Sequence, residues 1–572
     1  MLKRNDKIII QKMRQYILPG IMLTAALQIG NIVDTMLVGN LLGPDAMSAV
    51  KIGMAVDNII EIPGYVLGVG GSVAAGIFMG NREIEKAKKV FSVTLTISVL
   101  LGLVFSVFSI WSGTYAQWLC GGSTLVEDAR RFIFVTLLIS PVLGIALQII
   151  NYVAVDNNPT LASAYVITAN VINLVMDYIL LKYSSLGTAG AALSTGLGYG
   201  IALLLMIFYV KSDKRMLSIV NPFKDMAPHL LAALKAGIPT LLYMIFLTIK
   251  DMSMNTMIIR NVGESAMIIY TVCFNGMLCV QMFAGGIVGL LSNMGSVLYG
   301  KNDFYGIRVL IRRLLRYSCI AVGIFMLIIT VKPEIFLRLF GVTDAAVVTP
   351  GITALRIYIL SLPFYLWNHF MMVYYQSTDK TVLSSIITSL QTCVAIVPLA
   401  YAFVFAADKL EIDALNALVI SFIFSEIATL LITLIYQRIK YKNQNYFMIP
   451  KQQNDTVEFT VSNRPEQISE AIKIILEFCK NHKIPESVTA LANTVTENML
   501  NRIFSAGGAQ NTDMAINTTD NLLRIQLTDD GAPYNPAESV QAENNSRIHK
   551  TEYLRVIDLN YTMIEMNIAN CQ

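Results

Sequence analysis

The chain has 572 residues, of which 55% are hydrophobic and only 14% are charged. Soluble proteins carry about 25% charged residues, so this composition excludes an ordinary soluble enzyme and indicates a protein that lies mostly in a lipid bilayer. The 43 basic and 39 acidic residues nearly balance, which gives no electrostatic basis for binding nucleic acid. The seven cysteines form no Cys-x-x-Cys pair and no ligand spacing with the four histidines, so we expect neither a disulfide framework nor a zinc site.

The first apolar run, residues 17–42, is too long for a signal-peptide core and has no small-residue cleavage site. We interpret it as a retained membrane span. It carries Asp34 roughly 10 Å from its outer end, at 1.5 Å per residue. A carboxylate at that depth costs at least ~2.5–3.5 kcal/mol and is kept only where it faces a cavity or a partner. We therefore expect Asp34 to bind a coupling cation.

Apolar runs of about twenty residues predict twelve membrane spans. They cover residues 17–42, 50–79, 91–111, 132–155, 161–182, 188–210, 231–258, 265–298, 314–331, 352–375, 383–406 and 414–437. Lys and Arg cluster at the N-terminus and in alternate loops, which orients these segments toward the cytoplasm. We predict a multi-pass protein of the plasma (inner) membrane, with both termini and the C-terminal domain cytoplasmic.

The two halves of the apolar region repeat at an offset of 220 residues. The matches are Pro19 with Pro239, Gly43 with Gly263, Ala46-Met47 with Ala266-Met267, and Gly80 with Gly300. Six spans separate the copies, so they share one orientation, and a binding cavity is expected between them. The predicted fold class is an all-α polytopic membrane protein of two parallel six-helix lobes, residues 1–220 and 221–440.

Polar residues of the first lobe reach the depth of Asp34. Asp177 and Asn173 lie one turn apart in the fifth span, and Thr195 lies roughly 9 Å below the outer start of the sixth. Their oxygen atoms suit a hard cation such as Na⁺, and two carboxylates in apolar surroundings equally suit a proton. The repeat places Met254 and Val397 opposite the two acids, so we expect the site in the first lobe alone.

Other polar residues within the spans are candidates for a substrate cavity. Asp57 and Glu61 share one face of the second span, where they would either attract cationic substrates or hydrogen-bond between lobes. Asp251 adjoins Lys250, so it is either a cavity acid or half of an internal ion pair. His369 in the tenth span either faces the cavity or packs among aromatic residues.

After Tyr436 the composition becomes polar. Residues 441–456 are expected to form a juxtamembrane linker, and residues 457–572 a small soluble α/β domain. Alternating residues predict strands near 456–461, 513–518 and 522–528. Amphipathic patterns predict helices over 466–482 and 485–507.

The apolar region resembles the multidrug and toxic compound extrusion (MATE) family over about residues 10–440. The resemblance rests on the spacing of Pro19, Asp34 and Gly39, and on the segments GNREIEKA, AVDNNPT and GTAGAALST. It implies a twelve-span antiporter that expels organic cations and other amphiphiles against Na⁺ or H⁺, without a cofactor. It also implies a first-lobe cation site at the positions of Asp34, Asn173, Asp177 and Thr195.

The C-terminal domain resembles the GHKL ATPase fold of the anti-sigma-factor serine-kinase type. In TENMLN, the resemblance implies that Glu497 activates water and Asn501 holds magnesium; in LTDDGAPYNP, Asp529 and Gly531 would read adenine. The segment NSRIHKTEYLRVIDL contains no glycine where a phosphate lid would follow, and without one the backbone cannot wrap phosphates closely. We therefore expect a degenerate regulatory or partner-binding module rather than an ATP- and Mg²⁺-dependent enzyme.

These observations predict a secondary active exporter of small amphiphilic or cationic molecules. Two alternatives remain at this stage. A lipid-linked precursor flippase of the same superfamily would need a basic central cavity, and only Lys250 lies clearly within a predicted span. A membrane sensor with a kinase-like output would need a nucleotide bound to the C-terminal domain.

Overall fold

The structure is a computed structural model that describes nine stretches of the chain. They are residues 2–120, 125–212, 215–340, 345–442, 445–449, 456–506, 509–519, 521–536 and 547–568; at positions 31–36, 39, 44, 45, 47, 48, 51, 264, 265 and 339 only the backbone is described. The chain divides into two units. The helical unit contains residues 16–301 and 311–446, and the tail unit contains residues 1–15, 302–310 and 447–572.

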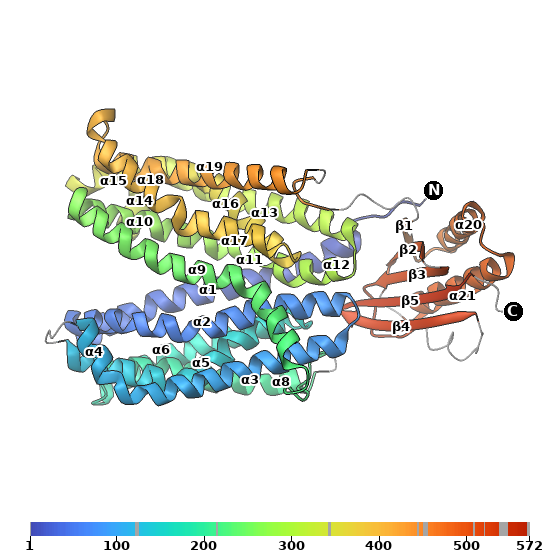
Figure 1. The fold of residues 1–572 in the computed structure, drawn as a ribbon, viewed down its shortest axis with the longest axis horizontal. Coiled ribbons are helices and arrows are strands. Elements are labelled where there is room, and N and C mark those ends of the chain that lie inside the picture. Colours follow the sequence, from blue (N-terminus) through green and yellow to red (C-terminus); the bar gives the residue numbers. More distant parts are fainter. Residues whose placement is uncertain are drawn as a thin grey trace. The chain divides into compact units, whose positions relative to one another are not determined.

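The helical unit consists of two bundles of long helices, seen in blue to cyan and in green to orange in Figure 1. The first lobe contains α1 (Lys7–Leu42), α2 (Pro44–Gly80), α3 (Ile84–Phe108), α4 (Ser112–Cys120), α5 (Val126–Val155), α6 (Pro159–Tyr183), α7 (Thr188–Ala202) and α8 (Met206–Val210). Prolines at the starts of α2 and α6 favour those boundaries, because the first helical turn needs no backbone N–H from them.

The second lobe repeats this plan with more interruptions. It contains α9 (Met226–Asn261), α10 (Glu264–Val280), α11 (Gly286–Val288), α12 (Ser296–Gly300), α13 (Phe304–Val331), α14 (Pro333–Leu339), α15 (Ala345–Tyr358), α16 (Leu362–Ser377), α17 (Thr381–Ser389), α18 (Ile396–Ala406) and α19 (Ala414–Lys440). Two π-helical segments, η3 (Gln281–Gly285) and η4 (Leu291–Gly295), interrupt the predicted eighth span. A third, η6 (Leu390–Val394), separates α17 from α18. Such bulges commonly occur at functional sites.

Within the described residues, eleven helices are long and apolar enough to cross a membrane. Their positions agree with the predicted spans from the second to the twelfth. The first predicted span falls within α1, where the side chains at 31–36 lie outside the described residues. The structure therefore supports a polytopic helical protein with about eleven described spans.

The two lobes approach each other through glycines. A Cβ on Gly70 would lie 2.2 Å from the carbonyl oxygen of Ala233 and 2.6 Å from the Cα of Gly237, so α2 and α9 pack backbone to backbone. A Cβ on Gly20 would lie 2.8 Å from the carbonyl oxygen of Gly286. The backbones of α1 and α11 are therefore also in close contact. Close helix contacts through small residues are typical of membrane bundles.

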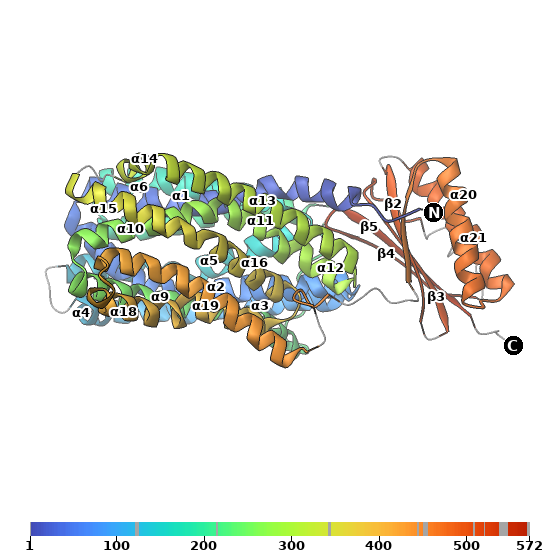
Figure 2. The ribbon, with the colours of Figure 1, turned by 90° about the horizontal axis from the view of Figure 1, so that it is seen from above.

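The C-terminal part of the tail unit is an antiparallel sheet of five strands in the order β1-β2-β3-β5-β4. The strands are β1 (Thr456–Ser462), β2 (Asn511–Thr519), β3 (Leu522–Asp529), β4 (Ile548–Val556) and β5 (Leu559–Asn567). Two helices, α20 (Pro465–Asn481) and α21 (Glu486–Ser505), lie on the same side of the sheet (Figure 2). Their apolar residues and those of the sheet form one buried core, which includes Phe459, Ile475 and Met499.

The sequence predicted both helices and the first three strands of this domain correctly. The hairpin of β4 and β5 was not predicted. It occupies the glycine-free stretch that follows residues 537–546, which lie outside the described residues. The GHKL resemblance would place a phosphate lid here, but this stretch lacks the glycines for one, and in the structure it forms the two strands that complete the sheet.

Candidate functional site

Three of the four predicted cation ligands can be placed, and they lie in one cluster of the first lobe. Asn173 Nδ2 lies 3.4 Å from Thr195 Oγ1 and 3.3 Å from Ser194 Oγ. Ser194 in turn hydrogen-bonds to Asp177 Oδ1. Asp177 and Ser194 are completely buried. The cluster joins α6 to α7 and presents one carboxylate, two hydroxyls and one amide.

The fourth predicted ligand, Asp34, has a side chain outside the described residues. The helix on either side of it is placed by its contacts. Gly30 packs against Asn170 of α6, and Val38 belongs to a buried cluster with Leu181 and Ala191. The turn of α1 that carries Asp34 therefore runs beside the helices that supply the other three residues.

The sequence did not single out Ser194. It adjoins Thr195, and its hydroxyl also lies 2.6 Å from the carbonyl oxygen of Ala191, the intrahelical partner that many helical serines use. Only the packing of α6 against α7 brings it to Asp177. Because carboxylate, hydroxyl and amide oxygens are the ligands that hard cations prefer, the cluster can hold Na⁺ or a proton once these internal hydrogen bonds rearrange.

A cavity of about 310 Å³ lies between the two lobes. Its described lining comes from both lobes and consists of Thr24, Leu27, Gln28, Val69, Pro239, Thr240, Tyr243, Gln281, Gly285, His369, Met372 and Gln376. All these residues are apolar or carry neutral amide, hydroxyl or imidazole groups. The cavity is within the size range of drug-binding pockets.

Only one of the four predicted substrate-cavity residues, His369, lines this central cavity. Asp57 and Glu61 lie on α2 within electrostatic range of each other and of Tyr65 and Tyr199. Neither acid is among the described residues of the cavity wall. Both acids belong to the first lobe, and Tyr199 of α7 in the same lobe interacts with them electrostatically.

Asp251 lies beside Lys250, as the ion-pair interpretation requires. The distance from Lys250 Nζ to Asp251 Oδ1 is 3.3 Å, and the lysine is buried whereas the aspartate is about half exposed. The ammonium group also lies 5.0 Å from the ring centroid of Phe274. His369 stacks on Tyr365 with a ring separation of 5.8 Å, so it both packs on an aromatic ring and faces the cavity.

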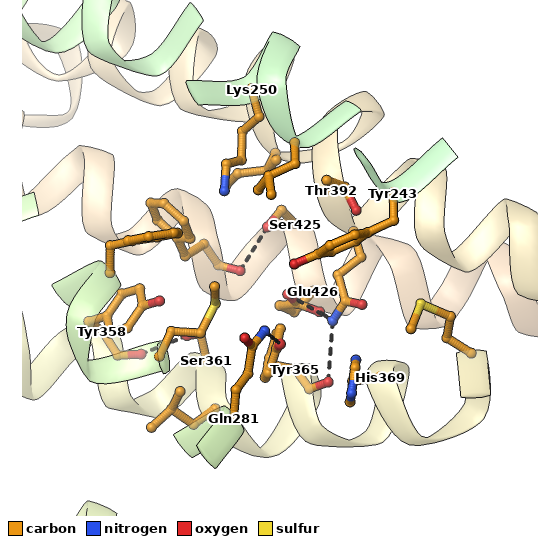
Figure 3. Close-up of a pocket in the computed structure, with 18 of the residues that line it drawn as sticks. Tyr243, Lys250, Gln281, Tyr358, Ser361, Tyr365, His369, Thr392, Ser425 and Glu426 are labelled. Atoms are coloured by element: carbon orange, nitrogen blue, oxygen red, sulfur yellow. Dashed lines mark hydrogen bonds between the residues drawn. The ribbon is translucent and has the colours of Figure 1, made fainter. Parts of the chain in front are cut away.

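The second lobe contains a polar pocket that the sequence did not predict (Figure 3). Its centre is Glu426 of α19, which is only 7% exposed. Asn368 Nδ2 donates to Glu426 Oε2 at 2.7 Å, and Gln391 Nε2 donates to the same oxygen at 3.1 Å. The cavity beside them measures about 50 Å³ and is walled by Lys250, Gln281, Tyr243, Tyr270, Tyr358, Tyr365 and His369, among others.

This pocket is too small for a drug-sized molecule but large enough for a few waters or a small cation. Its carboxylate receives hydrogen bonds from two amides rather than from an Arg or Lys. An acid within an apolar run was available as a signal in the sequence. The offset of 220 residues places Met206 opposite Glu426, so the repeat gives it no paired acid, as is also true of Asp34 and Asp177.

In the C-terminal domain, the four residues proposed for nucleotide binding have different environments. Glu497 and Asn501 are exposed on α21, one turn apart. Asp529 is buried at the end of β3, where its Oδ1 accepts from the backbone N–H of Gly531 at 2.9 Å and from Asn560 Nδ2 at 2.8 Å. Burial raises the pKa of Asp529, and the Asn560 contact opposes that shift.

One carboxylate oxygen of Asp529, Oδ1, is therefore already bound by groups of its own domain. Arg555 of β4 lies next to them and donates to the carbonyl oxygen of Gly531 at 2.9 Å and to Asn560 Oδ1 at 2.7 Å. A base that used Asp529 Oδ1 would have to displace these contacts.

The chain is similar to several known proteins. It matches the family model described as MatE over residues 19–179 and 239–402, more than half of its length. It is 23% identical over 347 residues to the probable multidrug resistance protein YoeA of Bacillus subtilis, covering 59% of this chain and 75% of that protein. It is also 23% identical over 234 residues to the multidrug export protein MepA of Staphylococcus saprophyticus, covering 40% of this chain and 51% of that protein.

Solved structures share the fold of the helical unit. One is a MATE protein in complex with MaL6, with a TM-score of 0.68, 19% identity, and coverage of 76% of this chain and 98% of that chain. Another is a MOP superfamily transporter from Pyrococcus furiosus, with a TM-score of 0.65, 20% identity, and coverage of 75% and 96%. With the family match over both halves and the two-lobed helical architecture, the chain belongs to the MatE family of multi-pass membrane transporters.

Proposed function

We propose that this protein is a secondary active antiporter that exports small amphiphilic or cationic molecules in exchange for Na⁺ or H⁺. The observation that carries the proposal is the first-lobe cluster of Asn173, Asp177, Ser194 and Thr195, in which Asp177 and Ser194 are buried, next to the turn of α1 that bears Asp34. Intramembrane carboxylates are costly, and their usual roles are ion and substrate pathways. The names of YoeA and MepA, with multidrug resistance and export, support the same function.

The central cavity supports broad substrate selection. Its wall combines apolar groups with the neutral polar groups of Gln28, Gln281 and Gln376. Such a wall can hold the apolar body of an amphiphile and hydrogen-bond its polar end without fixing its charge. Methionines such as Met372 add adaptable apolar surface.

Coupling follows from differential affinity. A cation that binds Asp34 and Asp177 takes over oxygen atoms that otherwise hydrogen-bond within the cluster. That exchange alters how α1, α6 and α7 pack. The ion then shifts the protein toward the substrate-releasing state by as much as its affinity differs between the two states.

We propose Glu426 as a second carboxylate in this coupling. It is buried, bound only by amides in the described contacts, and lies beside a cavity of cation size. Four side chains line both this pocket and the central cavity: Tyr243, Gln281, His369 and Met372. A protonation change at Glu426 would therefore reach the substrate through this shared wall.

The flippase alternative is less well supported. A pyrophosphate headgroup needs clustered Lys or Arg, and the described lining of the central cavity has neither. Lys250 lies in the second-lobe pocket and is paired with Asp251. The sensor alternative needs a nucleotide on the C-terminal domain, where Asp529 is bound by Gly531 and Asn560. We propose that this domain is a degenerate GHKL-like module in the cytoplasm that regulates transport.

The test is dye efflux in inverted membrane vesicles under an imposed Na⁺ or H⁺ gradient. The expected result is that one gradient drives export of a fluorescent cationic dye at least tenfold faster than no gradient. Asp34→Asn should remove this acceleration. Asp408→Asn, at an exposed acid two residues after α18 of the second lobe, serves as the matched control. Unchanged efflux in Asp34→Asn would show that the site is assigned wrongly.

A further inference from the structure

One arginine at the start of the chain lies at the centre of the tail unit. The side chain of Arg4 is only 8% exposed. Its Nη1 and Nη2 atoms lie 2.7 and 2.6 Å from the two carboxylate oxygens of Asp303. It also lies 3.2 Å from Glu458 Oε2 on β1 and 3.4 Å from Asp513 Oδ2 on β2. The forked contact to Asp303 is the geometry that gives Arg–carboxylate pairs their strength and specificity.

The residues around Arg4 hold it by several further contacts. The hydroxyl of Tyr305 donates to the carbonyl oxygen of Arg4 at 3.0 Å, and the guanidinium lies 4.8 Å from the ring centroid of Tyr305. The backbone N–H of Asn5 donates to Thr460 Oγ1 at 2.9 Å, and Thr460 donates to Asp513 at 2.6 Å. Leu2 packs against the apolar core of the domain.

The residues of this cluster come from three separate parts of the chain. Arg4 lies three residues before α1, a first-lobe helix, and Asp303 lies directly before α13, a second-lobe helix. Glu458 and Asp513 belong to the C-terminal sheet. A single ion cluster therefore joins the beginnings of one helix from each lobe to one folded domain.

We propose that the C-terminal domain is a latch that holds the beginnings of α1 and α13 together through Arg4 and Asp303, and so restrains the motion of the two lobes. Only the expected effect of the latch on export rests on the transport function proposed above. Any motion that separates the two helix ends must break the forked Arg4–Asp303 contact or pull residues 2–6 from the sheet. Both are costly because the charges involved are buried.

The charges favour a releasable latch over a permanent one. Arg4 provides one positive charge against three carboxylates. Burial and the neighbouring Asp303 raise the pKa of Asp513 to about 6, although Arg4 opposes this shift. Among these contacts the acids outnumber the base, so loss of a proton from Asp513 adds repulsion between carboxylates, and a competing cation can relieve it.

The first experiment measures whether the latch exists, independently of transport. Hydrogen–deuterium exchange of the full-length protein in nanodiscs should become at least tenfold faster in residues 2–6 and 456–462 on Arg4→Ala. Arg4→Lys, which keeps the charge and loses the fork, should show an intermediate rate. Lys3→Ala removes a charge at an exposed neighbour and should match the wild type. Equal protection in all four proteins would overturn the proposal.

The second experiment measures the restraint on the lobes. Spin labels at Glu85→Cys of α3 and Lys440→Cys of α19, both exposed, report the distance between lobes after replacement of the reactive native cysteines. Arg4→Ala should add a second distance population that Lys3→Ala lacks. An unchanged distance distribution would show that the cluster only stabilises the domain, and the latch would be refuted.

The third experiment measures the consequence for export. Arg4→Ala should raise the initial rate of dye efflux at least twofold, because a restraint has been removed. A rate that stays equal or falls, with a changed distance distribution, would overturn the restraining role. If the wild type exports no dye under any gradient, the proposed function fails, whereas the exchange and distance results still decide whether the latch exists.

Discussion

Gly80 and Gly300, which are 220 positions apart, pack against each other at the ends of α2 and α12. A Cβ on Gly80 would lie 2.9 Å from the Cα of Gly300, and a Cβ on Gly300 would lie 3.0 Å from the Cα of Gly80. Each would also lie 2.2 Å from a carbonyl oxygen, of Val297 and of Ile77 respectively. The internal repeat is thus visible as a contact between equivalent positions of the two lobes.

This contact predicts the effect of a single methyl group. Gly300→Ala should force α2 and α12 apart and destabilise this arrangement by about 1–3 kcal/mol, as overpacking usually does. Efflux should fall at least fivefold while membrane insertion stays normal. Gly323→Ala in α13 is the matched control, because a Cβ there meets nothing within 4 Å. Equal efflux in the two variants would contradict a role for the close contact.

The second-lobe pocket predicts a different phenotype for its acid. Glu426→Gln keeps the shape of the side chain and removes its charge. We expect it to abolish the dependence of efflux on external pH between 6 and 8, with dye binding changed less than threefold. Glu411→Gln, at an exposed acid near the start of α19, should leave that dependence intact. A pH profile of Glu426→Gln that overlays the wild type would exclude Glu426 from coupling.

The Arg4 cluster predicts a pH-dependent stability of the tail unit. Because the pKa of Asp513 is raised from 3.8 to about 6, the folded cluster favours the protonated acid. Its stabilising contribution is fully present below pH 3.8 and is lost as the pH rises through 6. Protection of β1 and β2 from hydrogen exchange should therefore fall between about pH 4 and 6.5, by ~1–3 kcal/mol.

The charged and titratable groups that face Asp513 define the control for this measurement. Arg4 contacts Asp513 directly, and Asp303 and Glu458 share Arg4 with it. Tyr305, which also binds Asp6, interacts with Asp513 electrostatically. Asp513→Asn should remove most of the pH slope after correction for the intrinsic exchange rate. Glu477→Gln, at an exposed acid of α20, should keep it. A slope that survives in Asp513→Asn would assign the titration to another member of the cluster.

The C-terminal domain predicts weak nucleotide binding. Since Asp529 is occupied by Gly531 and Asn560, titration of the full-length protein with a fluorescent ATP analogue and Mg²⁺ should show no saturation below 1 mM. Asp529→Ala should instead destabilise the domain by about 1–3 kcal/mol, because the buried donors of Gly531 and Asn560 would lose their acceptor. Micromolar binding that disappears in Asp529→Ala would restore the sensor interpretation.

Much of the fold follows from the sequence because its signals are local. The lengths of the apolar runs predict the membrane spans. Pro63 and Pro239 did not end helices, because they lie inside the long helices α2 and α9. Strand alternation gives β1 to β3. The hairpin of β4 and β5 was missed because His549, Lys550 and Arg555 give it no clean alternation. Its burial depends on pairing with β3, which is a property of the assembled sheet.

The candidate sites were predictable to different degrees. Asn173, Asp177 and Thr195 could be aligned by depth alone, because helix rise fixes height in a bilayer. Which residues meet at that height depends on helix rotation, so Ser194 and the pocket around Glu426 emerge only from packing. Asp57 and Glu61 reach the right depth, but they do not line the central cavity as described. Arg4 could not be predicted, since its partners are about 300 to 500 residues away in sequence.

The central claim is that a carboxylate cluster in the first lobe couples a cation to export. The most direct measurement is gradient-driven dye export by purified protein in proteoliposomes, comparing the wild type with Asp177→Asn and Ser194→Ala. We predict that Asp177→Asn reduces gradient-driven export at least twentyfold while dye binding is retained, and that Ser194→Ala gives an intermediate loss. Full gradient-driven export by Asp177→Asn would contradict the account.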